Sequence, residues 1–118
     1  MDEQAVIWMV GINCNAEDEE KFNAWYDDIH VPMLMQGDVV NKATRFKLAG
    51  KAYHVGATMQ PCPTYLTIYE FTNQAKFDAW MNSEARTEAG KDKEETWGDK
   101  VYDVQWATLY NQTNAWNV

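Results

Sequence analysis

A short aromatic pattern that occurs twice constrains the fold of this chain more than any other feature. The segment EKFNAWYDD in the first third of the sequence recurs as AKFDAWMNS in the second half. In each copy a Phe and a Trp lie three residues apart, which places them on one face of a helix. The repeat predicts two helices that bury the same aromatic pair in a core, Phe22 with Trp25 and Phe77 with Trp80.

Apolar segments flank both helices and are typical of β-strands. They are rich in β-branched and aromatic residues, as strands usually are. Strands are expected at residues 5–14, 39–48, 64–71 and 101–110. The order of elements is then β-α-β-β-α-β, in which two βαβ halves share one sheet. The sequence therefore predicts one α+β domain over residues 1–118, a ferredoxin-like fold with a four-stranded antiparallel sheet.

The ends of the helices and the connecting segments follow from individual residues. Asn15 can cap the first helix, which should end near His30 because Pro32 disfavours helical geometry in the residue before it. The second helix is expected over residues 74–81, with breaks towards Glu95. Residues 49–63 are expected to form a long loop, and residues 111–118 a polar tail.

Charge and hydropathy exclude several classes of partner. The chain has 18 acidic and 10 basic residues, a formal net charge of -8, and the basic residues are spread along the sequence. Without a basic patch, neither nucleic acid nor an anionic membrane surface is an expected partner. The acidic start of the chain is unlike a secretory signal, and no apolar segment reaches the length of a membrane span. A cytoplasmic protein is expected.

The first copy of the repeat contains two polar residues that the second lacks. Tyr26 and His30 are four residues apart and should meet on one helix face, whereas Met81 and Ala85 occupy the equivalent positions. Packing on the sheet therefore requires no histidine at this place. Two interpretations are open for His30. It either hydrogen-bonds a free carbonyl at the helix end, or faces a pocket as a general acid or base with Tyr26 as a neighbouring donor.

The pattern F-x-x-W-Y-x-x-x-H-x-P, in a chain with this order of elements, resembles the dimeric α/β-barrel superfamily and its EthD-like branch. The residues that carry the resemblance are Phe22, Trp25, Tyr26, His30 and Pro32. The aromatic residue four positions before the histidine is usually Trp in the EthD pattern, whereas here it is Tyr. The resemblance implies a homodimer whose two sheets close into a barrel, with one pocket per subunit between the sheet and its helices.

Polar-tipped aromatic residues on the strands are candidates to line that pocket. In the third strand Tyr65 and Tyr69 share one face, and Tyr69 is a candidate donor to a reacting oxygen; for Tyr65 a place in the dimer core is an equal alternative. In the fourth strand Trp106 is expected on the same face as Val104 and Thr108. The other candidate substrate-binding residues are Asn13, Met33 and His54. A hydrophobic or aromatic small molecule is the expected ligand.

Missing motifs narrow the chemistry further. The sequence has no P-loop, no GxGxxG, no HExxH and no Gly-x-Ser-x-Gly, and its two histidines are too few for most histidine-based metal sites. No cofactor or metal is expected. The first hypothesis is a cofactor-independent isomerase, cyclase or lyase that moves protons on an aromatic, polyketide-like or lactone metabolite. The second is a cofactor-free or haem-degrading monooxygenase, and the third is a non-catalytic binding or accessory protein.

Overall fold

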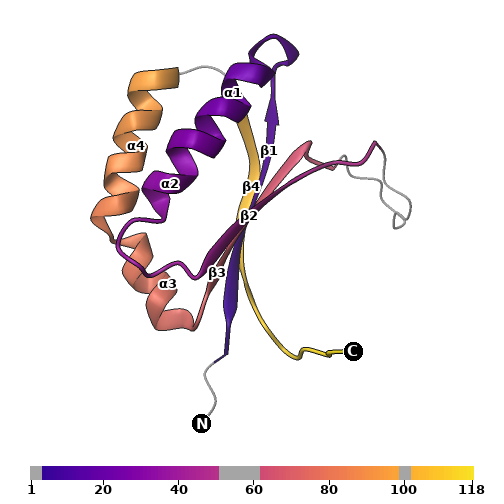
Figure 1. Cartoon of the computed structure of the whole chain (residues 1–118), viewed down its shortest axis with the longest axis vertical. Coiled ribbons are helices and arrows are strands. Elements are labelled where there is room, and N and C mark those ends of the chain that lie inside the picture. Colours follow the sequence, from indigo (N-terminus) through magenta and orange to yellow (C-terminus); the bar gives the residue numbers. More distant parts are fainter. Residues whose placement is uncertain (1–3, 51–61, 99–101) are drawn as a thin grey trace.

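A four-stranded sheet with helices on one face only forms the structure, a computed structural model that describes residues 4–50, 62–98 and 102–118 (Figure 1). The strands are β1 (Val6–Cys14), β2 (Lys42–Lys47), β3 (Tyr65–Phe71) and β4 (Tyr102–Asn111). The helices are η1 (Ala16–Asp18), α1 (Glu19–Trp25), η2 (Tyr26–His30), α2 (Val31–Leu34), α3 (Gln74–Met81) and α4 (Glu84–Trp97). Among these helices none is both long enough and apolar enough to cross a membrane.

The order of strands in the sheet is β2-β3-β1-β4, and every pairing is antiparallel. The two strands that precede the repeated helices, β1 and β3, lie side by side in the centre, and β2 and β4 form the edges. The predicted ferredoxin-like α+β fold is confirmed. The expected loop over residues 49–63 lies mostly outside the described residues, and His54 with it.

The first helical segment does not end at His30, so the expected stop before Pro32 is wrong. The chain passes from α1 through one wider π-helical turn, η2, and continues as α2 to Leu34. The Val31 N–H donates to the Tyr26 carbonyl across this wider turn. Pro32 then falls in the first turn of α2, where a residue needs no N–H partner within the helix. The added residue in η2 thus accommodates the proline inside a continuous helical segment.

Both copies of the aromatic repeat are buried, as predicted. Phe22, Trp25, Phe77 and Trp80 all lie in the core between the helices and the sheet. Each Trp also anchors its helix through the indole N–H. Trp25 donates to Asp92 of α4 (2.7 Å), and Trp80 donates to the Leu34 carbonyl at the end of α2 (2.9 Å). The repeat therefore fixes how three helical segments sit on one another as well as on the sheet.

A bulge in β4 changes which of its side chains face the helices. The register against β1 shifts between Gly11 and Ile12, so that Gly11 pairs with Trp106 but Ile12 pairs with Val104. Val104 consequently faces the helices, whereas Trp106 faces the opposite side with Thr108. The expectation that all three share one face is wrong, because simple alternation along a strand fails at an inserted residue.

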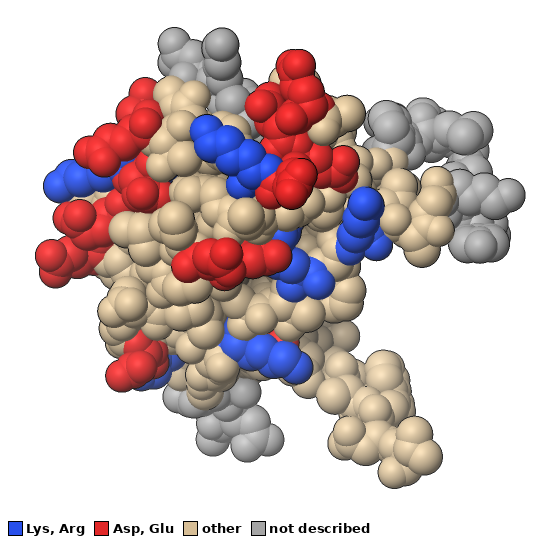
Figure 2. Space-filling model, turned by 45° about the horizontal axis from the view of Figure 1, so that its top comes forward, with Lys and Arg blue, Asp and Glu red and all other residues tan. Residues whose placement is uncertain are grey.

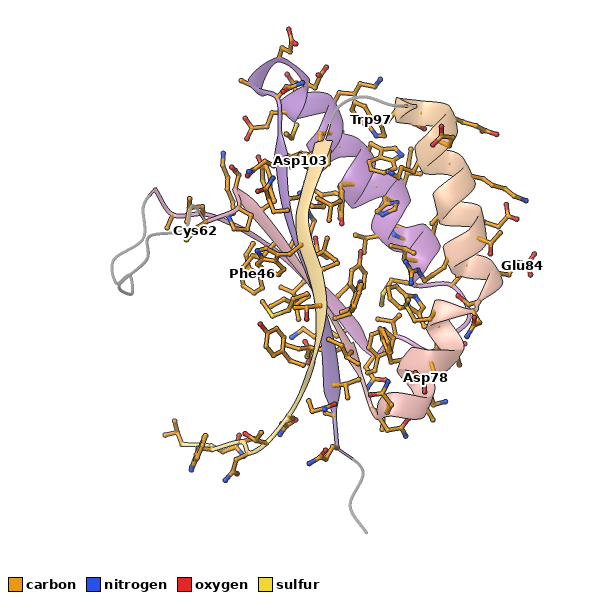
Figure 3. The ribbon with its side chains drawn as sticks, turned by 180° about the vertical axis from the view of Figure 1, so that it is seen from behind. Phe46, Cys62, Asp78, Glu84, Trp97 and Asp103 are labelled. Atoms are coloured by element: carbon orange, nitrogen blue, oxygen red, sulfur yellow. The ribbon has the colours of Figure 1, made fainter. Side chains whose placement is uncertain are left out.

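The side of the sheet opposite the helices, called the open face below, is apolar. By strand alternation it carries Ile7, Met9, Phe46, Leu66, Ile68, Trp106 and Tyr110. Figure 3 shows Phe46 on the side of the sheet away from Asp78 and Trp97 of the helices. The segment after β4 leaves the sheet on this same side and is exposed throughout, Trp116 included.

Removal of a core ring tests the assignment of the repeat. Phe22 has an exposed fraction of 0%, and its ring contacts Tyr26, Tyr65 and Trp97. We expect Phe22→Ala and Phe77→Ala each to lower the free energy of unfolding by about 3 to 5 kcal/mol, as for other buried aromatic residues. Denaturant unfolding measures the change. Ile29→Ala, at a position with an exposed fraction of 44% on the same helical segment, is the control and should change stability by less than about 1 kcal/mol. Equal effects of Phe22→Ala and Ile29→Ala would contradict the assignment.

Candidate functional site

A cavity of about 280 Å³ lies between the sheet and the helices. Its wall combines apolar and aromatic side chains with a few polar groups, as is common for sites that bind small molecules. The lining residues are Trp8, Val10, Ile12, Tyr26, His30, Leu34, Tyr69, Trp80, Arg86, Ala89, Gly90, Lys93, Val104 and Ala107. The exposed members of this set belong to α4 and β4, so the cavity opens between that helix and that edge strand.

Three residues proposed from the sequence as the reacting groups meet in this cavity. Tyr26 and His30 come from the π-helical turn η2, and Tyr69 comes from the central strand β3. The ring centroids of Tyr26 and His30 are 4.9 Å apart, as the helical spacing predicted. Tyr69 packs on Trp80 with centroids 5.2 Å apart, and its neighbours Thr67 and Tyr26 bring its hydroxyl group into the same polar cluster.

Tyr26 is held rigidly and stays protonated. Its ring lies under the guanidinium of Arg45 at 4.4 Å, and Arg45 is fixed in turn by an ion pair with Asp27 (2.7 Å). Burial raises the pKa of Tyr26 above its ordinary value, while hydrogen bonding with the Thr67 and Tyr69 hydroxyls and the charge of Arg45 act in the opposite direction. At neutral pH the Tyr26 hydroxyl is therefore a hydrogen-bond donor rather than a phenolate.

His30 is held by stacking rather than by a hydrogen bond. Its imidazole lies on the indole of Trp25, with centroids 4.6 Å apart and planes at 26°. Trp25 itself is anchored to Asp92, so α4 positions the histidine through the tryptophan. The Nδ1 atom of His30 is buried and makes no hydrogen bond with any residue in the described ranges. The histidine is not at a helix end, and the interpretation as a helix cap is not supported by its contacts.

The environment keeps His30 neutral. Burial lowers its pKa from 6.5 to about 4, and the nearby positive charges of Lys93, Arg45 and Arg86 act in the same direction, whereas Asp92 opposes them. At pH 7 the imidazole is uncharged and can accept a proton. A neutral imidazole beside a phenol donor can take part in proton transfer next to a carbonyl group.

Two basic residues of α4 complete the wall and were not found from the sequence. Arg86 and Lys93 both line the cavity, and both are half-buried. They lie seven residues apart with Gly90 between them, so all three share one face of α4. This spacing is the signal that the sequence offered. The pattern is difficult to recognise because the same helix also carries many carboxylates. Acidic side chains cover the outer surface of α4 in Figure 2.

Four other residues proposed for the site lie elsewhere. The Tyr65 hydroxyl donates to Glu19 and accepts from Asn23 (2.9 Å), so it ties β3 to α1 on the helix side of the sheet and outside the cavity. The Asn13 side chain accepts from the Thr64 N–H (2.8 Å) and joins the ends of two strands. Trp106 is on the open face with an exposed fraction of 39%.

Met33 belongs to a second cavity. This space of about 500 Å³ lies between the end of α2 and the start of α4, with an apolar wall and two carboxylates, Glu84 and Glu88, at its rim. Tyr26, His30 and Tyr69 are not among the residues that line it. Met33 therefore lines a different cavity from His30. No group of three or more His, Cys, Asp or Glu side chains within the described ranges is arranged to hold a metal ion.

Residues 5–110 match a protein family described as "Domain of unknown function (DUF4286)". No curated protein matches the chain. Among solved structures, an EthD-like protein from Ralstonia eutropha is 20% identical, with a TM-score of 0.61 over 92% of this chain and 91% of its own. A DABB family protein with a ferredoxin-like fold from Mesorhizobium loti is 9% identical, with a TM-score of 0.57 over 96% of this chain and 99% of its own.

SnoaB, a cofactor-independent oxygenase from Streptomyces nogalater, is a third similar structure. It is 10% identical, with a TM-score of 0.59 over 95% of this chain and 96% of its own. Likeness at such low identity establishes the fold rather than the reaction. The chain thus shares its ferredoxin-like fold with EthD-like and DABB proteins, as the sequence predicted.

The lowered pKa of His30 predicts how stability depends on pH. The unfolded chain binds more protons than the folded one between pH 6.5 and about 4, so stability should fall as the pH decreases through this interval. His30→Phe keeps a ring on Trp25 but cannot be protonated. On acidification, its free energy of unfolding should therefore fall by up to about 3 kcal/mol less than that of the unaltered protein. Denaturant unfolding of both proteins at pH 7 and pH 4.5 measures the difference. Parallel losses in the two proteins would show that His30 is not buried as a neutral group.

Proposed function

The chain belongs to the DUF4286 family, and we propose that it is a small cofactor-independent enzyme that moves protons on an aromatic, polyketide-like or lactone substrate. One observation carries the proposal: a half-buried, neutral histidine faces a largely apolar cavity that two tyrosine side chains also line. The second copy of the repeat packs with Met81 and Ala85 at the positions of Tyr26 and His30, so packing on the sheet requires neither a tyrosine nor a histidine there.

The proposed reaction begins with removal of a proton from a carbon next to a carbonyl group. The neutral His30 imidazole takes the proton, and the electron pair of the C–H bond moves to the carbonyl oxygen. Tyr26 or Tyr69 donates a hydrogen bond to the enolate oxygen as its charge develops. The imidazolium then returns the proton to another carbon of the conjugated enolate, which completes an isomerisation. Alternatively, the enolate carbon attacks a second carbonyl group of the substrate; the C=O π electrons move to that oxygen, which takes the proton from the imidazolium and completes an aldol-type cyclisation.

Trp8 and Trp80 are suited to bind the substrate, whereas His30 and the tyrosines would move the proton. Both line the cavity, and a planar ring system can lie against their indoles with little polar surface to desolvate. Trp80 is also fixed by its hydrogen bond to Leu34, so the wall that would meet the substrate is rigid. A rigid wall helps to hold the reacting carbon within reach of His30.

A cofactor-free oxygenase is the second candidate. The observation that favours it is the fold shared with a cofactor-independent oxygenase. Removal of a proton by His30 would also be the first step here, because an electron-rich carbanion can reduce O₂ directly and then combine with the reduced oxygen. Oxygen consumption with anthrone, whose central CH₂ group is acidic, distinguishes this reaction from an isomerisation.

The enzyme is proposed to act as a homodimer joined through its open faces. In each subunit the exposed fractions of Phe46 and Tyr110 are 49% and 55%, and neighbouring positions on the same side of the sheet are also apolar. An apolar sheet surface of this kind is characteristic of a protein interface. A second copy provides a cover of the same shape and polarity, as the resemblance to dimeric α/β barrels implies.

Loss of His30 should impair turnover far more than folding. With 2-tetralone as a carbon-acid probe in D₂O, we expect the protein to accelerate deuterium exchange, and His30→Ala to reduce that rate by about 10²-fold or more. Tyr26→Phe should cause a smaller loss, because it removes one hydrogen bond and keeps the ring. Proton NMR follows the exchange, and the melting temperature reports folding. Ile29→Ala, next to His30 but directed to solvent, is the control. If the unaltered protein does not accelerate exchange, the enzyme proposal is dropped in favour of a binding protein.

Charge placed on the open face should separate the subunits. Light scattering is expected to give twice the chain mass of 13.7 kDa for the unaltered protein and a single chain for Phe46→Glu. Ile29→Glu introduces the same charge at a similarly exposed apolar position on the helical side and should leave the dimer intact. A well-folded unaltered monomer at micromolar concentration would overturn the proposed dimer.

A further inference from the structure

We infer that the substrate carries a carboxylate, which Arg86 and Lys93 of α4 bind within the cavity that His30 faces. The inference rests on the proposed function, because it names the charge and the chemical class of the molecule on which that site acts. It concerns a small aromatic acid, whose ring would occupy the apolar wall and whose carboxylate would meet the two cations.

The charges in the cavity are opposite to those of the protein as a whole. The chain has 18 acidic and 10 basic residues. Among the described residues that line the cavity, however, both groups that are charged at neutral pH are cations, Arg86 and Lys93, and none is a carboxylate. The only charged site in the wall is therefore suited to an anion, whereas the acidic outer surface of α4 repels one from other places.

Arg86 is arranged to receive a planar anion. Its guanidinium lies over the Trp80 ring at 4.9 Å and contacts the Met81 sulfur, and no ion pair with a carboxylate forms within the described part of the chain. Burial lowers the pKa of Arg86, with only Tyr69 opposing, yet an arginine remains charged at neutral pH. A carboxylate would relieve the cost of burying this charge through paired N–H···O bonds.

Gly90 leaves space between the two cations. It lies four residues after Arg86 and three before Lys93, on the same face of α4 and at the cavity wall. A Cβ atom at this position would meet no atom within 4 Å. The helix thus presents a gap, flanked by two positive side chains, that is open to a group entering from the mouth of the cavity.

An anion in this gap would also strengthen the base. The charged groups that act on His30 are Asp92, Lys93 and Arg86 of α4 and Arg45 of β2, and three of these four are cations that disfavour the imidazolium. A bound carboxylate would offset the two cations of α4. The pKa of His30 should then rise from about 4 towards its usual value, so that the substrate itself improves the proton acceptor.

The experiment compares two probes that differ in charge alone, 2-naphthoate and 2-naphthamide, by calorimetric titration of the full-length protein. We expect the naphthoate to bind about 10- to 100-fold more tightly than the amide, as one charge-assisted pair would allow. Arg86→Gln should reduce this preference by about 5-fold or more, because only Lys93 then remains to pair with the carboxylate, and should change the affinity for the amide much less. Its melting temperature confirms that the variant is folded.

Substitution of Gly90 supplies a matched pair of variants. Gly90→Glu should place a carboxylate between Arg86 and Lys93 and weaken naphthoate binding at least 10-fold relative to Gly90→Gln, which has the same shape without the charge. Both should fold, because the space is open and either side chain favours a helix more than glycine does. The imidazole signals in NMR should show the pKa of His30 rising with naphthoate but not with the amide; the chain has only two histidines.

The outcomes separate this inference from the proposed function. Equal affinity for the two probes, or a preference that Arg86→Gln leaves undiminished, would overturn the carboxylate inference. If His30→Ala still abolished deuterium exchange in that case, the proposed function would stand without it. Failure of both probes to bind, with no exchange by the unaltered protein, would overturn both.

Discussion

Burial of two aromatic helix faces against a single side of the sheet is the constraint on which the rest of the structure depends. Phe22 and Trp25, then Phe77 and Trp80, occupy that side, and the indole N–H groups of both tryptophans fasten neighbouring helices together. Because every helix is used on this side, the other side of the sheet keeps its apolar residues exposed. The same packing thus creates a cavity beneath the helices and an apolar face that a second subunit would cover.

The wider turn η2 gives the first helical segment its candidate functional residues in addition to its packing role. Trp25 and His30 are five residues apart, and in a regular α-helix their side chains would point about 140° apart around the axis. In the π-helical turn their rings stack at 4.6 Å, and Tyr26 remains beside the histidine. The added residue also lets the helix continue past Pro32. One local change in helical geometry therefore buries His30, aligns it with Tyr26 and joins it through Trp25 to Asp92 of α4.

Electrostatics divide the molecule into an acidic exterior and a cavity whose charged groups are basic. Desolvation makes His30 a neutral base and keeps Tyr26 a donor, and both effects come from the same apolar enclosure. The cations of α4 lower the pKa of His30 further, which makes it a weaker base. An anionic ligand would offset this effect. Because the cavity excludes water, the electrostatic interactions among His30, the cations of α4 and a bound anion are stronger there than in solvent.

The sequence alone determined the fold class, because the repeated Phe–Trp pairs and four apolar segments are local patterns that depend only on the periods of helix and strand. It also determined that Tyr26 and His30 meet, since they are four residues apart in one helical segment. Only the tertiary structure decided the rest. The π-helical turn, the β4 bulge that turned Trp106 to the open face, and the entry of Arg86 and Lys93 into the cavity wall all depend on contacts between distant segments. Those contacts select among local geometries that differ little in energy, and no periodicity along the chain records the choice.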